Sequence, residues 1–457
     1  MVPVILHFLV WALLLLCATA VSWFAIASWR EGEARAVWVA LIGGLATTLP
    51  LAILATVEFP GRVQVVWVLL GLFAALIIML LWPDRRAALP SRMSPTARID
   101  ERDTMFSRRE LRPGSARYTD YYERHPQLEA VDRKWRNKPG LMSSDSRYAH
   151  RFAFAASDGS FSTIEALHAL VDATPSGDPV RPTPQEASRF LLSWSRKLGA
   201  LDAGITSLSP LHIYSTAGRG DRYDQMIDLD HPFALAFTVE MDHDMMQSAP
   251  AAATLMESAH QYLNSGAIAV QIANTIGNLG YRARAHVDGN YQVICPLVAR
   301  DAGLGEIGRM GLLMTPDHGP RVRIGIVTTD MPLVPTARRP QPSVEDFCDQ
   351  CEKCARLCPS QAIPYGRRAD QQTEDRWRID SESCFGYWCD AGTDCARCMI
   401  TCPYSHPDTA LHRLVRVGIR KSPLLRRIAA PLDDLAYGRR PAPKALPQWL
   451  GRSLRED

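Results

Sequence analysis

The chain has 457 residues, of which 47% are hydrophobic and 22% are charged, and its formal net charge is +3 at pH 7. This length allows about three domains, and this composition is ordinary for a globular protein, which excludes a chain that is disordered throughout. We expect no nucleic-acid partner. The average composition conceals one anomaly, which lies in the first 82 residues.

Three uncharged or nearly uncharged runs occupy residues 4–27, 36–57 and 63–82. Each reaches the roughly 20 residues that a helix needs to cross a bilayer. A cleaved signal peptide would need a basic segment before the first run, and no Lys or Arg precedes Arg30. The sequence therefore predicts three transmembrane helices.

Arginine is distributed unevenly around the three runs. Arg30 and Arg35 lie in the first loop, and only Arg62 lies in the second. The segment after the third run is basic, with Arg85, Arg86, Arg92, Arg98 and Arg102. Because basic loops stay on the cytoplasmic side, we expect a multi-pass protein of the inner (cytoplasmic) membrane. Its N-terminus would lie outside and the bulk of the chain in the cytoplasm, which suits reduced thiols.

The middle of the chain alternates helical and strand-like patterns. Helices are expected at 161–174, 184–198 and 251–279, and strands at 200–214, 234–240, 292–297 and 321–328. The second helix opens with Thr183 as N-cap, Pro184 at the first helical position and Glu186 as the capping-box partner. Strands that alternate with helices predict an α/β domain.

A glycine-rich turn at 302–309 contains Gly303, Gly305, Gly308 and Arg309. Its G-x-G-x-x-G spacing suggests a dinucleotide site, but no strand leads directly into the turn and no acidic residue closes a second strand about 20 residues later. Glycine lets backbone amides approach a large ligand closely. We therefore take these four residues as candidates for binding a cofactor that is not a dinucleotide.

Nine of the eleven cysteines lie between Cys348 and Cys402. The first run is FCDQCEKCARLCP, and the second ends in C-x2-C-x3-C-P. A C-x2-C-x2-C-x3-C-P run is the ligand spacing of a cubane iron-sulfur cluster. A zinc site needs only four ligands in two pairs, and a disulfide framework needs a small secreted domain. The spacing therefore predicts two [4Fe-4S] clusters.

The last cysteine of each run is expected to serve the other cluster. The first cluster would then take Cys348, Cys351, Cys354 and Cys402. The second would take Cys358, Cys395, Cys398 and one further thiol, for which Cys384 and Cys389 are the alternatives.

Several blocks of the sequence resemble the reductive dehalogenases. They are DTMFSRREL, YYERHP, RNKPGL, YLNSGAIAVQIANTIGNLGYRA, AGLGEIGRMGLLMTPDHGPRVR, VTTDMPL and the two cysteine runs including CFGYW. The resemblance covers roughly residues 98–408. It implies a nitroreductase-like α/β fold that holds a corrinoid of the cobalamin type, with a ferredoxin-like two-cluster module beside it. The absence of a D-x-H-x-x-G run fits a corrinoid bound base-off.

The same resemblance implies a function and its residues. The enzyme would remove halide from an organohalide. The arginine pattern puts this reaction on the cytoplasmic side of the membrane, and we expect an external electron donor that is a quinol or a ferredoxin-type protein. Tyr262 resembles the catalytic tyrosine of the family, and either Arg321 or Arg323 resembles its active-site arginine. Asn290 lies where a polar partner is expected. In the CFGYW block, the family pattern points to Cys384 as the fourth ligand of the second cluster.

Two other functions fit parts of the sequence. The chain is also similar to epoxyqueuosine reductases, and it could be a membrane-anchored electron-transfer protein with two [4Fe-4S] clusters and no substrate of its own. About 200 residues of α/β domain precede the clusters, which favours a substrate site.

We expect five segments: a membrane anchor at 1–83, a basic linker and arm at 84–140, the corrinoid and substrate domain at 141–340, the cluster module at 341–410, and a basic segment at 411–457.

Overall fold

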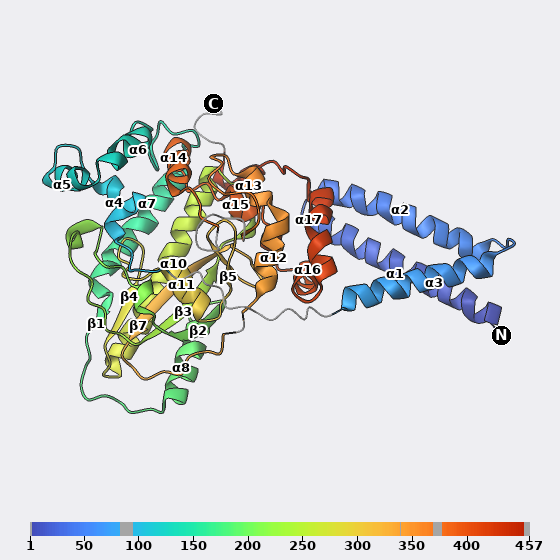
Figure 1. The fold of residues 1–457 in the computed structure, drawn as a ribbon, viewed down its shortest axis with the longest axis horizontal. Coiled ribbons are helices and arrows are strands. Elements are labelled where there is room, and N and C mark those ends of the chain that lie inside the picture. The colour runs from blue at the N-terminus through green and yellow to red at the C-terminus, as the bar shows by residue number, and fades with distance from the viewer. Residues whose placement is uncertain (1, 83–94, 339, 369–376, 452–457) are drawn as a thin grey trace. The chain divides into compact units, whose positions relative to one another are not determined.

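The computed structural model describes residues 2–82, 95–338, 340–368 and 377–451 (Figure 1). Arg85, Arg86 and Arg92 of the predicted basic segment lie outside the described residues. The chain forms two compact units. Unit 1 combines residues 1–87 with 408–442, and unit 2 combines residues 88–407 with 443–457.

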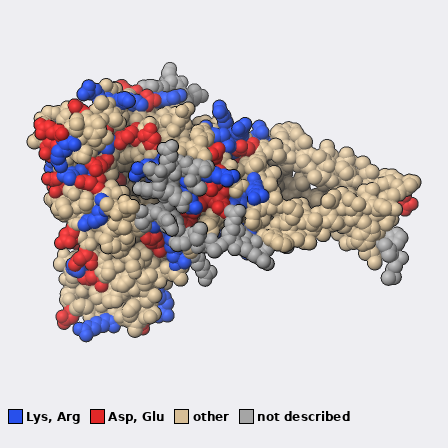
Figure 2. Space-filling model, viewed as in Figure 1, with Lys and Arg blue, Asp and Glu red and all other residues tan. Residues whose placement is uncertain are grey.

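Unit 1 contains three long helices, α1 (Val2–Arg30), α2 (Ala34–Thr56) and α3 (Arg62–Leu81). Their most apolar stretches have mean hydropathies of 2.3, 2.1 and 2.7, so all three are long and apolar enough to cross a membrane. Figure 2 shows almost no charged side chains along them. At Gly44 a Cβ atom would lie 2.4 Å from Val21 Cγ1, so glycine allows α1 and α2 to pack closely.

Two amphipathic helices, α16 (Ala410–Lys421) and α17 (Pro423–Tyr437), belong to the same unit. They pack at the turn between α1 and α2. His412 Nε2 lies 3.1 Å from a carboxylate oxygen of Glu31, and Arg35 Nε donates to the carbonyl of Leu435 at 2.9 Å. One face of α16 and α17 is thus buried against the other helices of unit 1.

Unit 2 is built on a five-stranded sheet in the order β1 (Asp172–Ala173), β4 (Ala283–His286), β7 (Val322–Thr329), β3 (Phe233–Glu240) and β2 (Asp202–Ser207) (Figure 1). Every neighbouring pair is antiparallel. The long central pair runs in register from Phe233 opposite Thr329 to Glu240 opposite Val322. The predicted mixture of helices and strands is confirmed.

Each face of the sheet carries its own hydrophobic core, because successive side chains of a strand point to opposite faces. On β3, Leu235 and Phe237 pack into the core that includes α10 (Ala252–Asn278). Ala234 and Ala236 pack into the core that includes α11 (Cys295–Asp301). The long helix predicted at 251–279 is confirmed as α10.

The flanking helices agree only in part with the patterns. The helix expected at 184–198 is α8 (Pro184–Lys197), with the predicted capping box. The helix expected at 161–174 is wrong in its second half, because α7 (Arg151–Ala166) gives way to a 3₁₀ turn and then to β1. The strand expected at 292–297 is also wrong. Among the described residues only Val293 pairs there, in an isolated bridge, and Pro296 is the second residue of α11, within the first turn, where a helix tolerates proline.

An N-terminal arm packs on the cysteine-rich region within unit 2. A buried ion pair between Arg108 and Asp132, with Nε and Oδ2 2.8 Å apart, joins the first helix of the arm to the third. The Trp135 ring packs edge-on against Phe385, with centroids 5.1 Å apart. The arm contains α4 (Met105–Glu110), α5 (Ala116–Arg124) and α6 (Pro126–Arg136). The cysteine-rich region contains α12 (Pro342–Cys351), α13 (Lys353–Leu357), α14 (Ser381–Ala391) and α15 (Arg397–Ile400).

Candidate functional site

The structure gathers the cysteines into two sets. Set 1 consists of Cys348, Cys351, Cys354 and Cys402, which line one small cavity together with Phe347 and Pro403 and are all buried. Three come from α12 and α13, and the fourth comes from the turn after α15. The structure thus brings together the four thiols that were predicted to hold the first cluster.

Set 2 consists of Cys358, Cys384, Cys395 and Cys398, whose thiols are electrostatic neighbours of one another. Cys384 and Cys389 both lie on α14, five residues apart, so their side chains point about 140° away from each other. Cys389 packs instead with Trp135 and Phe385. Only Cys384 faces the other members of the set.

Burial strongly disfavours negative charge on these sulfurs. It raises the pKa of Cys348 to about 11, of Cys384 to about 11 and of Cys395 to about 12. Thiolates in such surroundings need a bound cation as a counter-charge, and thiolate is the ligand that iron-sulfur clusters require. The two sets therefore supply the number and type of donors that two clusters of four thiolates each require.

The predicted cofactor-binding glycines pack against the chain itself. A Cβ atom at Gly305 would lie 2.2 Å from the carbonyl oxygen of Met314, and one at Gly308 would lie 2.8 Å from Met314 Cγ. Met314 belongs to the two-residue strand β6 (Leu313–Met314), which pairs with β5 (Glu306–Ile307). Gly303 has a φ of +87°, which favours glycine. The close approach of β6 therefore requires glycine at Gly305 and Gly308.

Arg309 is fully buried beside set 1. Its Nη2 donates to the carbonyl of Cys348 at 2.7 Å, and its Nη1 donates to the carbonyls of Pro364 and Gly366, both at 2.8 Å. Its Cζ atom lies 4.7 Å from the ring centroid of Trp377. This candidate for cofactor binding is therefore placed to support the first cysteine set.

A cavity of about 230 Å³ lies where β7 begins. Tyr262 of α10 and Arg323 of β7 line it, together with Tyr214, Tyr291 and Met399. Met399 directly follows Cys398 on α15. The segment from Cys395 to Met399, which we call the loop of set 2, therefore forms part of the wall. The remaining lining residues are Val293, Cys295, Pro296, Leu312, Leu313, Pro320, Val322 and Ile324.

Arg323 is held against Tyr262 by two further groups. Its Cζ atom lies 4.3 Å from the centroid of the Tyr262 ring, within the range of a cation–π interaction. Its Nη2 donates to Asp394 Oδ2 at 3.0 Å and also to Ser258 Oγ. A tyrosine and a guanidinium, anchored by a carboxylate, thus meet at the cavity.

The electrostatics keep the Tyr262 phenol protonated. Arg323 is the largest single influence and lowers the pKa of Tyr262, but burial and the carboxylates of Asp288 and Asp394 outweigh it, so the pKa is raised. The hydroxyl is therefore a proton donor at neutral pH, and a cation stands beside it to stabilise the phenolate that donation would leave.

The other two predicted catalytic residues lie elsewhere. Arg321 is fully buried. Its Nη1 lies 2.7 Å from Glu240 Oε1, and its Nε donates to the carbonyl of Ser405 at 3.3 Å. Asn290 is buried, and its Oδ1 accepts from Arg284 Nη2 at 2.5 Å. Neither lines the cavity. Of the four candidates, the structure brings Tyr262 and Arg323 together.

Sequence reasoning missed Ser258, Asp394 and the tyrosines Tyr214 and Tyr291. Ser258 lies one helical turn before Tyr262 on α10, so helical spacing places both on one face. Asp394 directly precedes Cys395, which is the only local sign of its position. Tyr214 and Tyr291 carry no such signal.

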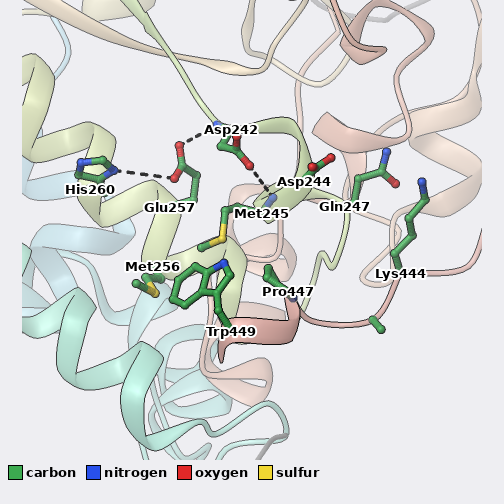
Figure 3. Close-up of a pocket in the computed structure, with 11 residues that line it drawn as sticks. Asp242, Asp244, Met245, Gln247, Met256, Glu257, His260, Lys444, Pro447 and Trp449 are labelled. Atoms are coloured by element: carbon green, nitrogen blue, oxygen red, sulfur yellow. Dashed lines mark hydrogen bonds and ion pairs between the residues drawn. The ribbon is translucent and has the colours of Figure 1, made fainter. Parts of the chain in front are cut away.

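A second cavity, of about 660 Å³, lies on another side of α10 (Figure 3). Asp242 and Glu257 line it with His260, and the C-terminal stretch contributes Lys444 and Trp449. The buried Glu257 carboxylate accepts from the Asp242 amide at 2.7 Å, and burial raises the pKa of Glu257. None of the predicted site residues lines this cavity.

Comparison with known proteins agrees with this arrangement. Residues 347–406 match the family of 4Fe-4S dicluster domains. The tetrachloroethene reductive dehalogenase of Sulfurospirillum multivorans is 34% identical over 208 residues, which cover 44% of this chain and 41% of that protein. One from Desulfitobacterium hafniense is 33% identical over 211 residues, which cover 44% of this chain and 38% of the relative. The chain thus matches well under half the length of these relatives.

An epoxyqueuosine reductase of Francisella cf. novicida is 31% identical over 109 residues, which cover 24% of this chain and 26% of that protein. Among solved structures, a reductive dehalogenase described as B12-dependent has a TM-score of 0.62 at 24% identity and covers 78% of this chain and 49% of its own. A catabolic reductive dehalogenase in complex with 3-bromo-4-hydroxybenzoic acid has a TM-score of 0.59 at 24% identity, over 79% of this chain and 51% of its own. The chain is therefore similar in sequence to reductive dehalogenases over part of its length, shares the fold of solved reductive dehalogenases, and matches the 4Fe-4S dicluster family at residues 347–406.

Proposed function

We propose that the protein is a reductive dehalogenase, which replaces a carbon–halogen bond of a small organohalide with a carbon–hydrogen bond. Electrons would pass through two [4Fe-4S] clusters, one on each cysteine set, to a corrinoid. The observation that carries the proposal is the contact between Tyr262 and Arg323 in a cavity whose wall includes the loop of set 2. A proton donor and an electron path meet there.

The residues around the cavity fit a corrinoid in their chemistry. Among the described residues, Arg323 Nε and Asp394 Oδ1 are buried without a hydrogen-bond partner, and Tyr214, Tyr262 and Tyr291 line the cavity beside them. The cavity of about 230 Å³ is smaller than the roughly 300–1,000 Å³ of typical ligand pockets, so a macrocycle needs its walls to part. A bound corrinoid supplies a cobalt centre that exchanges electrons with the clusters and with the substrate.

The protein's own contribution is the proton. Reductive dehalogenation consumes two electrons and one proton for each halide released. The Tyr262 hydroxyl would give its proton to the carbon that loses halide, and Arg323, 4.3 Å from the ring centroid, would stabilise the phenolate until solvent reprotonates it. The apolar side chains of Leu312, Leu313 and Ile324 would exclude water from the reacting carbon.

Electrons would come from an external donor, either a quinol or a ferredoxin-type protein. The electron-transfer alternative, without its own substrate, needs no tyrosine–arginine pair beside a cavity, and the structure contains one. An enzyme with an activity like that of epoxyqueuosine reductases would use the same corrinoid and clusters. The identity of the substrate therefore distinguishes the two functions.

Anaerobic reconstitution of the full chain in detergent tests this function. We expect about eight irons and one cobalt per chain, because two cubane clusters and one corrinoid are loaded. With a low-potential reductant, chloride or bromide should be released from at least one member of a panel of aryl and alkyl halides. A chain that holds the iron but takes up no cobalt and releases no halide would instead be an electron carrier.

We further propose that unit 1 anchors the protein in the inner membrane with unit 2 on the cytoplasmic side. Arg30 and Arg35 flank the turn between α1 and α2. The helices that pack at this turn add Arg413, Arg416, Arg420, Lys421, Arg426 and Arg427 to the same end of unit 1. The turn between α2 and α3 has only Arg62 as a basic residue. The positive-inside rule places the arginine-rich end in the cytoplasm.

Protease accessibility checks this orientation. A tag at the C-terminus should survive added protease in intact spheroplasts and be cleaved in inverted membrane vesicles. The reverse pattern would place unit 2 on the outer side, and release of the chain by a high-pH carbonate wash would contradict membrane anchoring.

A further inference from the structure

The carboxylate of Asp394 lies between the predicted proton donor and the second cysteine set. Its Oδ2 accepts from Arg323 Nη2 at 3.0 Å, and Arg323 covers the ring of Tyr262. The next residue along the chain is Cys395. The buried Asp394 carboxylate therefore contacts Tyr262 through Arg323, and Asp394 is bonded directly to a predicted cluster ligand.

The backbone around Asp394 is held tightly in place. Thr393 Oγ1 donates to the carbonyl of Pro250 at 2.7 Å, and the amide of Ala396 donates to the carbonyl of Asp394 at 2.7 Å. Cys395 and Ala396 have positive φ angles of 62° and 51°, which a chain adopts only where its surroundings demand it. This turn directs consecutive side chains apart, with the Asp394 carboxylate toward β7 and the Cys395 thiol toward the other thiols of set 2.

Asp394 has a neighbour of each kind. Its carboxylate pairs with Arg323, and its backbone continues directly into Cys395. Arg323 pairs with no other carboxylate among the described residues, and its remaining hydrogen-bond partner is the neutral hydroxyl of Ser258. Without Asp394, the buried guanidinium would lose its counter-ion.

We propose that Asp394 is a positioning residue that holds Arg323 over Tyr262 and ties the proton donor to the loop of the second cluster. This inference rests on the proposed function. An electron added to that cluster brings negative charge toward the same ion pair that supports Tyr262. Electron supply and proton supply are thus linked through a single buried carboxylate, although cluster and tyrosine belong to distant parts of the sequence.

Three substitutions separate the charge of Asp394 from its anchoring role. Asp394→Asn removes the charge, Asp394→Glu keeps it, and Ser258→Ala removes the neutral hydroxyl that contacts both Arg323 and Asp394. Asp390→Asn is the matched control, since Asp390 lies on α14 in the same region and makes no ion pair among the described residues. Each full-length protein is reconstituted with iron and corrinoid. The cluster potentials are then measured by EPR-monitored redox titration, and kcat and KM by halide release.

We expect Asp394→Asn to shift one cluster to a more positive potential, because a buried negative charge near it is lost. We also expect its kcat to fall about tenfold or more with little change in KM, as part of the 10²–10⁴-fold effect of a general acid. Asp394→Glu should restore the potential. Ser258→Ala should lower kcat without moving either potential, and Asp390→Asn should change neither quantity.

An Asp394→Asn protein with the potentials and kcat of the Asp390→Asn control would overturn the inference. If Asp394→Asn fails to hold iron, Ser258→Ala decides the anchoring role, and an unchanged kcat in that variant contradicts it. A wild-type protein with both clusters but no halide release would refute the proposed function alone. The potential difference between Asp394→Asn and Asp390→Asn would still show whether Asp394 acts on the cluster.

Discussion

Tyr262→Phe is expected to lower kcat for halide release by about 10²- to 10⁴-fold, which is the range for loss of a positioned general acid. The substitution removes one oxygen atom and leaves the aromatic ring under Arg323, whose Cζ lies 4.3 Å from the ring centroid. The cation–π contact and the packing on α10 therefore persist. Steady-state halide release, with iron and cobalt counted in the same samples, measures the effect.

The matched control is Tyr281→Phe, which also removes one hydroxyl. That hydroxyl donates to the carbonyl of Val180 at 2.9 Å and lies outside the cavity lining. We expect wild-type kcat for this variant. If Tyr262→Phe retained wild-type kcat with both clusters and corrinoid loaded, Tyr262 would not be the proton donor.

Cys384→Ala is expected to remove one cluster of the two, which lowers the iron content from about eight to about four per chain. Cys384 faces Cys358, Cys395 and Cys398, and three remaining thiolates hold a cubane cluster poorly. Without that cluster the electron path to the cavity is broken, so halide release should be lost as well. Iron analysis and the EPR spectrum of the reduced protein report the missing cluster.

Cys389→Ala serves as the control from the same helix. Its thiol packs with Trp135 and Phe385, and its electrostatic neighbours are Arg109 and Lys138. We expect this variant to keep both clusters and to lose only a small part of its stability. Full iron content in Cys384→Ala together with a lost cluster in Cys389→Ala would reverse the assignment.

Some features were predictable because they depend on residues close together in the sequence. The three long helices of unit 1 follow from the length and hydropathy of the runs alone. The two cysteine runs follow from spacing, because a cubane cluster requires thiols at fixed intervals on a tight loop. The capping box of α8 depends only on Thr183 and Glu186, three residues apart.

Local patterns failed where distant packing decides the conformation. The stretch at 292–297 is β-branched and apolar enough for a strand, yet Pro296 at the second position of α11 and the packing of α11 on the sheet make a helix there. At the turn 302–309, Gly305 and Gly308 allow close contact with Met314, and a cofactor at this turn stays a prediction. A glycine pattern shows that something approaches closely, but it does not show what approaches.

The sequence by itself determined the composition of this protein's machinery: an apolar three-helix segment, an α/β region and two sets of cluster-type cysteines. Tertiary structure alone decided which side chains meet. Cys384 and Cys389 lie on different faces of α14, and Cys389 packs in a hydrophobic cluster. Arg321 pairs with Glu240, whereas Arg323 pairs with Asp394. It also brought Asp394 to β7. These outcomes depend on contacts between residues far apart in the chain, which local spacing cannot encode.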